Sequence, residues 1–161
     1  MENIILKCAL SAGIMVFMLS CNTMQRNSAA AVDTSQIKNQ LQAKEDSFAA
    51  VFNSGILKNI GYYADDATSF LQNTAPLVGK EEIIAFLESD LQGNTNKISF
   101  KTNEVFPSND GSMVVEIGSF KVVDSANNPV NSGNYMTIFQ KRNGKYVAVR
   151  DMSTSDGVFI K

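Results

Sequence analysis

Two adjacent carboxylates, Asp65 and Asp66, follow two tyrosines in the stretch YYADDATSFL, residues 62–71. A carboxylate beside phenol hydroxyls could serve as the general acid or base of a small enzyme. The same side chains could instead accept hydrogen bonds from backbone N–H groups two residues further on, which is how Asp commonly stabilises a turn. The residue types alone leave both interpretations open.

Composition narrows the chemistry that this chain of 161 residues can perform. The chain contains no His and only two Cys, Cys8 and Cys21, which strongly disfavours zinc or copper sites built on imidazole or thiolate groups and excludes any catalytic triad with a His base. Acid–base chemistry therefore falls to Asp, Glu, Tyr or Lys, and we expect no metal and no cofactor. The net charge of −2 argues against a nucleic-acid partner, which needs a basic surface.

The elements that must position these side chains begin with helices. From Thr34 onward, apolar residues recur at helical spacing as far as Asn53, with Thr34 or Ser35 as the expected N-cap. We expect a second, short helix over Ile56 to Tyr62. A third helix should begin at Gly79-Lys80, because Glu81 and Glu82 then lie in its first turn, where the helix dipole favours negative charge.

The remainder of the chain alternates apolar and polar residues with a period of two. This pattern predicts a short extended piece from Thr68 to Leu71 and four long strands, over Ile98 to Phe106, Met113 to Val123, Val130 to Lys141 and Lys145 to Met152. The Asn143-Gly144 turn between the last two strands is the strongest hairpin signal. Helices followed by an antiparallel meander predict an α+β domain in which a curved sheet wraps the helices.

The N-terminus has the pattern of an export signal. Thirteen residues from Cys8 to Ser20 carry no charge, too few to span a bilayer as a helix, and they are typical of a signal peptide. The sequence MLSC at residues 18–21 resembles the lipobox of bacterial lipoproteins. We therefore expect a lipoprotein signal peptide at 1–20, lipidation of Cys21 and a flexible tether at 21–33. An ordinary secretory signal or an uncleaved anchor is the alternative.

Three segments, GYYADDAT (61–68), VGKEEIIAFL (78–87) and the last two strands with their turn, together resemble the nuclear transport factor 2-like superfamily in its SnoaL-like branch. The resemblance covers residues 34–156 and leaves a C-terminal tail at 157–161. It implies a cone-shaped, cystatin-like α+β fold, with about three N-terminal helices packed in a curved antiparallel sheet of four long strands plus short edge strands. The superfamily contains isomerases, cyclases, hydrolases and dehydratases as well as non-catalytic domains, so the fold by itself does not define a function.

The catalytic positions of the steroid isomerases in that superfamily hold other residues here. Leu71 stands where the resemblance places the general base, Ser47 stands in place of the phenol donor, and the segment from Tyr135 to Ile138 offers no acid. The Asp-Arg-Asp arrangement of the epoxide hydrolases has no match, and the dehydratase arrangement requires His. We therefore interpret Asp65 and Asp66 as structural residues of a turn.

The sharpest remaining feature is Asp151. Val147, Val149 and Asp151 alternate along the last strand, and two valines mark their shared face as buried, so the carboxylate should point into the cone that the resemblance implies. We expect a candidate pocket there, formed with Tyr63, Phe70, Phe86 and Phe106. The plainer interpretation, which we prefer, is that Asp151 bonds backbone or a Tyr hydroxyl at the end of the sheet and that the aromatic residues are core.

These observations predict a lipoprotein anchored to the bacterial outer membrane on its periplasmic side. Its domain should bind a small apolar ligand or a protein partner without catalysis. The alternative is a small isomerase, cyclase or hydrolase with a rearranged site around Asp151 and Tyr residues. Apolar residues such as Tyr135 and Phe139, which we expect on the outer sheet face, predict a homodimer formed through the sheet.

Overall fold

A computed structural model describes residues 32–58 and 60–157 of the chain. The predicted signal peptide, Cys21 and most of the tether lie outside the described residues. Within the described ranges, two helices and six strands follow one another as α1 (Thr34–Asn53), β1 (Tyr63–Leu71), β2 (Leu77–Val78), α2 (Lys80–Asp90), β3 (Lys97–Pro107), β4 (Met113–Val123), β5 (Pro129–Arg142) and β6 (Lys145–Ser155).

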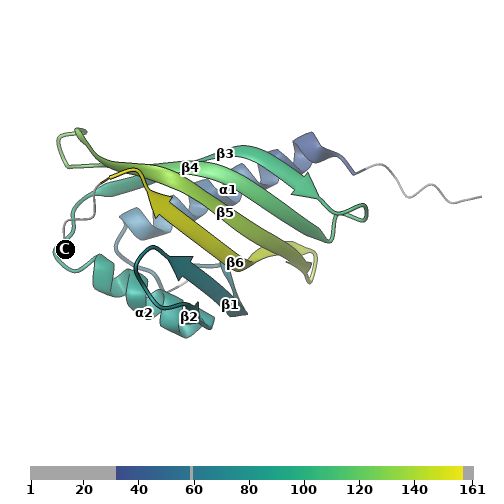
Figure 1. Cartoon of the computed structure of the whole chain (residues 1–161), viewed down its shortest axis with the longest axis horizontal. Helices are drawn as coiled ribbons and strands as arrows, with labels where there is room; N and C mark the ends of the chain where they lie inside the picture. The colour runs from purple at the N-terminus through teal and green to yellow at the C-terminus, as the bar shows by residue number, and fades with distance from the viewer. Residues whose placement is uncertain (1–31, 59, 158–161) are drawn as a thin grey trace, which may run out of the picture.

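The six strands form one curved, mixed sheet in the order β2-β1-β6-β5-β4-β3. The pairs β3–β4, β4–β5 and β5–β6 are antiparallel, as the hairpin signals predict, but β1 runs parallel to β6. Figure 1 shows α1 crossing one face of the sheet, while α2 lies beside β1 and β2. The prediction of a wholly antiparallel sheet is therefore wrong, because β1 pairs in parallel with β6, the last strand of the antiparallel meander.

Helix α1 begins and ends close to the predicted bounds. Its N-cap is Asp33, whose Oδ1 accepts a 2.9 Å hydrogen bond from the backbone N–H of Gln36, and not Thr34 or Ser35. The predicted short helix over residues 56–62 is absent: its described residues form turns that lead into β1. Helix α2 starts after Gly79 with Glu81 and Glu82 in its first turn, as predicted.

Polar side chains of α1 cover the outer edge of β3. The side-chain amide of Asn53 donates to the carbonyl oxygen of Ile98 (2.9 Å) and its oxygen accepts from the N–H of the same residue (2.8 Å). Gln42 accepts from the N–H of Thr102 (2.8 Å) and donates to the carbonyl of Phe100 (3.2 Å). These bonds occupy backbone groups that an open edge strand would otherwise offer to another chain.

Two β-bulges decide which side chains face the helices. The β3–β4 register shifts between Thr102 and Glu104, and the β5–β6 register shifts between Ile138 and Phe139, which places the β6 bulge at residues 148–150. Each extra residue reverses the inward and outward alternation beyond it.

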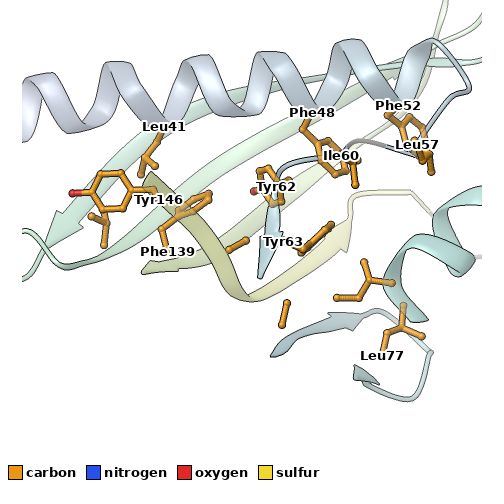
Figure 2. Packing of buried hydrophobic residues seen from close by; sticks show 14 of the residues in the cluster. Leu41, Phe48, Phe52, Leu57, Ile60, Tyr62, Tyr63, Leu77, Phe139 and Tyr146 are labelled. Carbon is orange, nitrogen blue, oxygen red and sulfur yellow. The ribbon is translucent and has the colours of Figure 1, made fainter. Parts of the chain in front are cut away.

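The core lies between α1 and the inner sheet face. Leu41, Val114, Phe139 and Ala148 are fully buried there, and Figure 2 shows the aromatic side chains of this layer beneath α1. Among the described residues, no helix has the length and hydropathy needed to cross a membrane.

Candidate functional site

A cavity of about 230 Å³ opens between α1, α2 and the inner face of the sheet. Its wall is mainly aromatic, with carboxyl and hydroxyl groups at several points. The described residues that line it are Glu45, Phe48, Phe52, Tyr62, Tyr63, Leu71, Phe86, Leu87, Asp90, Ile98, Phe100, Phe120, Tyr135, Thr137, Asp151 and Ser153.

The aromatic rings of the wall support one another. The Phe48 and Tyr62 ring centroids are 4.8 Å apart, those of Tyr62 and Tyr63 4.9 Å, and those of Phe100 and Tyr135 5.5 Å. Figure 2 shows Phe48, Tyr62 and Tyr63 lying together below α1. The first pair is tilted and the other two are edge-to-face, and such packing favours defined ring orientations for the tyrosines.

A polar row crosses the inner face of the sheet. Glu116 of β4 pairs in register with Thr137 of β5, Thr137 pairs with Asp151 of β6, and Asp151 pairs with Ser69 of β1. Cross-strand partners lie on the same face of a sheet, so these four side chains project toward α1. We call Glu116, Thr137, Asp151 and Ser69 the polar row.

Glu45 reaches the polar row from α1. It is 1% exposed, and its Oε1 accepts a 2.5 Å hydrogen bond from the Tyr62 hydroxyl. Burial, and secondarily the charge of Glu116, raise the pKa of Glu45 to about 9, although the Tyr62 hydrogen bond acts in the opposite direction. Glu45 is therefore a neutral carboxylic acid at neutral pH and can donate a hydrogen bond.

Glu116 is fully buried beside it. Its Oε1 accepts hydrogen bonds from the hydroxyls of Thr102 (2.5 Å) and Tyr135 (3.0 Å), whereas its Oε2 has no hydrogen-bond partner. Burial raises its pKa, and the two hydroxyl donors partly offset this effect. Because it accepts two donors, Glu116 is the member of the pair that ionises first, and Glu45 keeps the proton.

Tyr135 reaches Glu116 because the opposing residue is a glycine. A Cβ atom at Gly118 would lie 2.2 Å from the Tyr135 ring, which is impossible without moving the ring. The hydrogen bond from Tyr135 to Glu116 thus depends on a position that carries no side chain.

Asp151 lies inside, as predicted, but the reason differs. Its neighbours on the inner face are Tyr146 and Ala148, while Val147 pairs with Gln140 on the outer face. The bulge at residues 148–150 then turns Asp151 inward. Its Oδ2 accepts from the Tyr63 hydroxyl (3.2 Å), its Oδ1 is buried without a partner, and burial raises its pKa.

The other predicted pocket residues divide into two groups. Tyr63 and Phe86 line the cavity. Phe70 and Phe106 do not: they are 40% and 53% exposed, and their placement in the pocket was wrong. Phe106 faces outward because the β3 bulge reverses the alternation after Thr102. Phe70 alternates with the inward Ser69, since the smaller side chain occupies the place opposite Asp151.

Asp65 and Asp66 belong to strand β1 and not to a turn. Asp66 forms a two-pronged ion pair with Arg142, with N–O distances of 2.5 and 2.9 Å, and this hydrogen-bonded guanidinium lowers its pKa. Asp65 is almost fully exposed, 3.6 Å from Lys80. Neither lines the cavity, so neither is part of the candidate site; the expected backbone hydrogen bonds are replaced by ion pairs.

The positions compared with the steroid isomerases are Leu71, Ser47 and the segment from Tyr135 to Ile138. Leu71 lines the cavity and brings no carboxyl group to it. Ser47 lines a separate, smaller recess on the other side of Phe48 and Tyr62. Tyr135 and Phe139 are buried at 7% and 0% exposure, so their expected place on the outer face was wrong.

Glu45 and Glu116 were not predicted as site residues, although both occupy core positions of a periodic apolar pattern. Glu45 lies four residues after Leu41 and three before Phe48, on the apolar stripe of α1. Glu116 alternates with Val114 and Gly118 at the inward positions of β4. A charged residue at a core position of a periodic pattern is a candidate for function.

Solved structures with the same fold extend these observations. No protein-family model matches the chain, and no curated protein sequence matches it. A domain of unknown function with a cystatin-like fold from Nostoc punctiforme superposes with a TM-score of 0.67 at 12% identity, covering 78% of this chain and 81% of the other. A ketosteroid isomerase-like protein from Erwinia carotovora gives a TM-score of 0.61 at 14% identity, covering 75% and 97%.

An NTF-2 like protein of unknown function from Shewanella oneidensis gives a TM-score of 0.59 at 16% identity, covering 76% of this chain and 98% of the other. Identities this low establish the fold and not the activity. The sheet order, the helix across its inner face and these likenesses agree with one another. The chain has the cystatin-like fold of the nuclear transport factor 2-like proteins.

Proposed function

We propose that the domain binds a small, largely apolar molecule in the cavity beneath α1. The observation that carries this proposal is an aromatic-walled space of about 230 Å³ that meets hydroxyl and carboxyl groups on the polar row. A buried apolar cavity of about 150 Å³ is large enough to bind benzene, so this space fits one ring with a short substituent. Apolar walls with a few convergent polar groups are typical of ligand sites.

Native mass spectrometry of the purified protein tests this proposal directly. Spectra recorded under gentle and then dissociating conditions should reveal a retained small molecule, and the same measurement reports the oligomeric state. As a control, Leu71→Trp places a large side chain in the cavity wall and should reduce retention. A protein that retains nothing and binds no aromatic probe would contradict the proposal.

We favour binding without catalysis, because Leu71, Ser47 and the segment from Tyr135 to Ile138 lack the groups that the isomerase resemblance implies. One observation supports the enzyme alternative. Asp151, with its raised pKa and a free Oδ1, could act as a base, and protonated Glu45 with Tyr62 could stabilise a developing negative charge. Turnover of a steroid, epoxide or polyketide-like substrate that is lost in Asp151→Asn would establish this alternative.

We also propose that the protein is a lipoprotein held at the periplasmic side of the outer membrane by a lipidated Cys21. The support is the lipobox-like MLSC sequence followed by a polar tether. Metabolic labelling with a fatty-acid probe should label the wild-type chain and not Cys21→Ala. Equal labelling of the two chains would rule out this anchor.

The outer sheet face supports a homodimer proposal, although its residues differ from those expected. Ile117, Met136, Met152 and Phe70 form a cross-strand row over β4, β5, β6 and β1, and the last three are 40–50% exposed. Contiguous exposed apolar surface favours association. Met136→Lys should convert a dimer to a monomer in analytical ultracentrifugation, and a wild-type monomer would refute the proposal.

A further inference from the structure

The carboxyl groups around the cavity lack a cationic partner. None of the described residues that line it is Lys or Arg, whereas Glu45, Asp90 and Asp151 all contribute to its wall. Lys44, the neighbour of Glu45 on α1, donates to the carbonyl oxygen of Gly61 (3.0 Å) and lines the separate recess. Buried carboxyl groups in proteins are ordinarily paired with a cation or a metal ion.

Among the described residues, two buried side-chain oxygens have no hydrogen-bond partner. They are Oε2 of Glu116, whose side chain is 0% exposed, and Oδ1 of Asp151. The two residues stand on β4 and β6 with Thr137 of β5 between them in register, and neighbouring strands are separated by about 4.8 Å. Of the two residues, only Asp151 lines the cavity, so Asp151 is the one that a donor group of a ligand can reach.

The surrounding rings suit a positive charge. The faces and edges of Phe48, Tyr62, Tyr63, Phe100 and Tyr135 surround this part of the cavity. Aromatic faces attract ammonium groups through the negative charge of the ring quadrupole, and the attraction increases when water is excluded. The same rings provide the apolar surface for the body of a ligand.

We propose that the ligand of this cavity is a small organic amine, bound as its ammonium ion with an N–H group directed to Asp151, the carboxylate of the polar row that lines the cavity. The inference rests on the proposed function, namely that the cavity binds a small molecule. A metal ion is the competing cation, but among the described residues no group of carboxylates converges closely enough to hold one. An ammonium ion supplies both the missing charge and the missing hydrogen-bond donor.

The titration behaviour of the site supports the same ligand class. The ionisable groups that line the cavity are Glu45 from α1, Tyr62 just before β1, Tyr63 of β1, Asp90 at the end of α2, Tyr135 from β5 and Asp151 from β6. Glu116 of β4 does not line the cavity but accepts a hydrogen bond from Tyr135. Burial raises the pKa of Glu45, Glu116 and Asp151. A bound cation favours their ionised forms, so binding should release protons.

Three probes that share one ring and differ in head-group charge test the inference: phenethylammonium, 2-phenylethanol and phenylacetate. Isothermal titration calorimetry of the purified full-length protein should show that the ammonium probe binds at least about tenfold more tightly than the alcohol, as expected for a hydrogen bond to a charged group. Phenylacetate should bind least tightly. Titrations in two buffers of different ionisation enthalpy should show proton release for phenethylammonium only.

An isosteric variant locates the ammonium group. Asp151→Asn should remove most of the preference for phenethylammonium over 2-phenylethanol while leaving the alcohol affinity nearly unchanged. Glu104→Gln, at an exposed site on β3, is the matched control and should retain the full preference. Alcohol binding in the same variants reports whether the cavity is still folded.

The outcomes distinguish the amine inference from the proposed binding function. If 2-phenylethanol binds as tightly as phenethylammonium, or if binding releases no protons, the amine inference is wrong and the cavity remains a site for small neutral molecules. If none of the three probes binds, the amine inference and the proposed binding function both fail. If the preference persists in Asp151→Asn, the ammonium group lies elsewhere and the proposed site is wrong.

Discussion

Glu45 should make the stability of the domain depend on pH, because its carboxyl group holds a proton in the folded state that it loses in the unfolded chain. Burial raises its pKa from 4.5 to about 9. Between these two values the folded protein binds one more proton than the unfolded chain, so the free energy of unfolding falls as pH rises. The stabilisation is fully present below the unfolded pKa and is lost as pH rises through the folded pKa.

One proton corresponds to a slope of about 1.4 kcal/mol per pH unit. Raising the pH from about 6 to about 8 should therefore lower the free energy of unfolding by about 2.7 kcal/mol. The raised pKa values of Glu116 and Asp151 act in the same direction. Carboxylates with lowered pKa values, such as Asp110 at about 2, are ionised in both states throughout this range and do not contribute.

Urea denaturation measured at several pH values within this range gives the slope directly. Glu45→Gln keeps an acceptor for the Tyr62 hydroxyl but cannot ionise, so its curve should be much flatter than that of the wild type. Glu104→Gln, at an exposed position, should keep the wild-type slope. A wild-type stability that does not change with pH, or a slope that Glu45→Gln leaves intact, would refute the reasoning.

Three further substitutions test separate contacts. Gly118→Ala should cost about 1–3 kcal/mol of unfolding free energy, because the new Cβ displaces the Tyr135 ring; urea curves that overlay those of the wild type would contradict this. Asn53→Ala should cost about 1 kcal/mol and speed hydrogen exchange at the Ile98 amide, since that N–H loses its acceptor; unchanged exchange would show that the bond contributes nothing. Asp66→Asn should leave the urea midpoint unchanged at high salt, because its ion pair is exposed; a large shift there would mean that Asp66 has a buried role.

Local patterns in the sequence predicted most of the secondary structure. The apolar spacing of α1, the acidic first turn of α2 and the period-two alternation of the four long strands each reflect a preference that acts within one element. The short helix over residues 56–62 failed because its few apolar residues, including Leu57 and Ile60, are buried by tertiary contacts in a turn. A segment of this length gains little from helix formation alone.

The candidate site was only partly predictable. The expectation that Asp151 points inward was correct, but it was based on Val147, which lies on the outer face. Asp151 points inward because the β6 bulge reverses the alternation between these two residues. The β3 bulge had the opposite effect and moved Phe106 to the outside. A bulge inserts one residue without changing the residue types on either side, so periodicity cannot locate it.

The sequence by itself determined the α+β order of elements, the absence of His chemistry and the position of most strands, because these depend on residue type and short-range spacing. Only the tertiary structure brought Glu45 from α1 beside Glu116 from β4, 71 positions apart in the chain, and set both near Asp151. It also decided their protonation, since a carboxyl group acquires a raised pKa only when the surrounding fold removes water and places other carboxyl groups nearby. The chemistry of the cavity is therefore a property of contacts between distant segments.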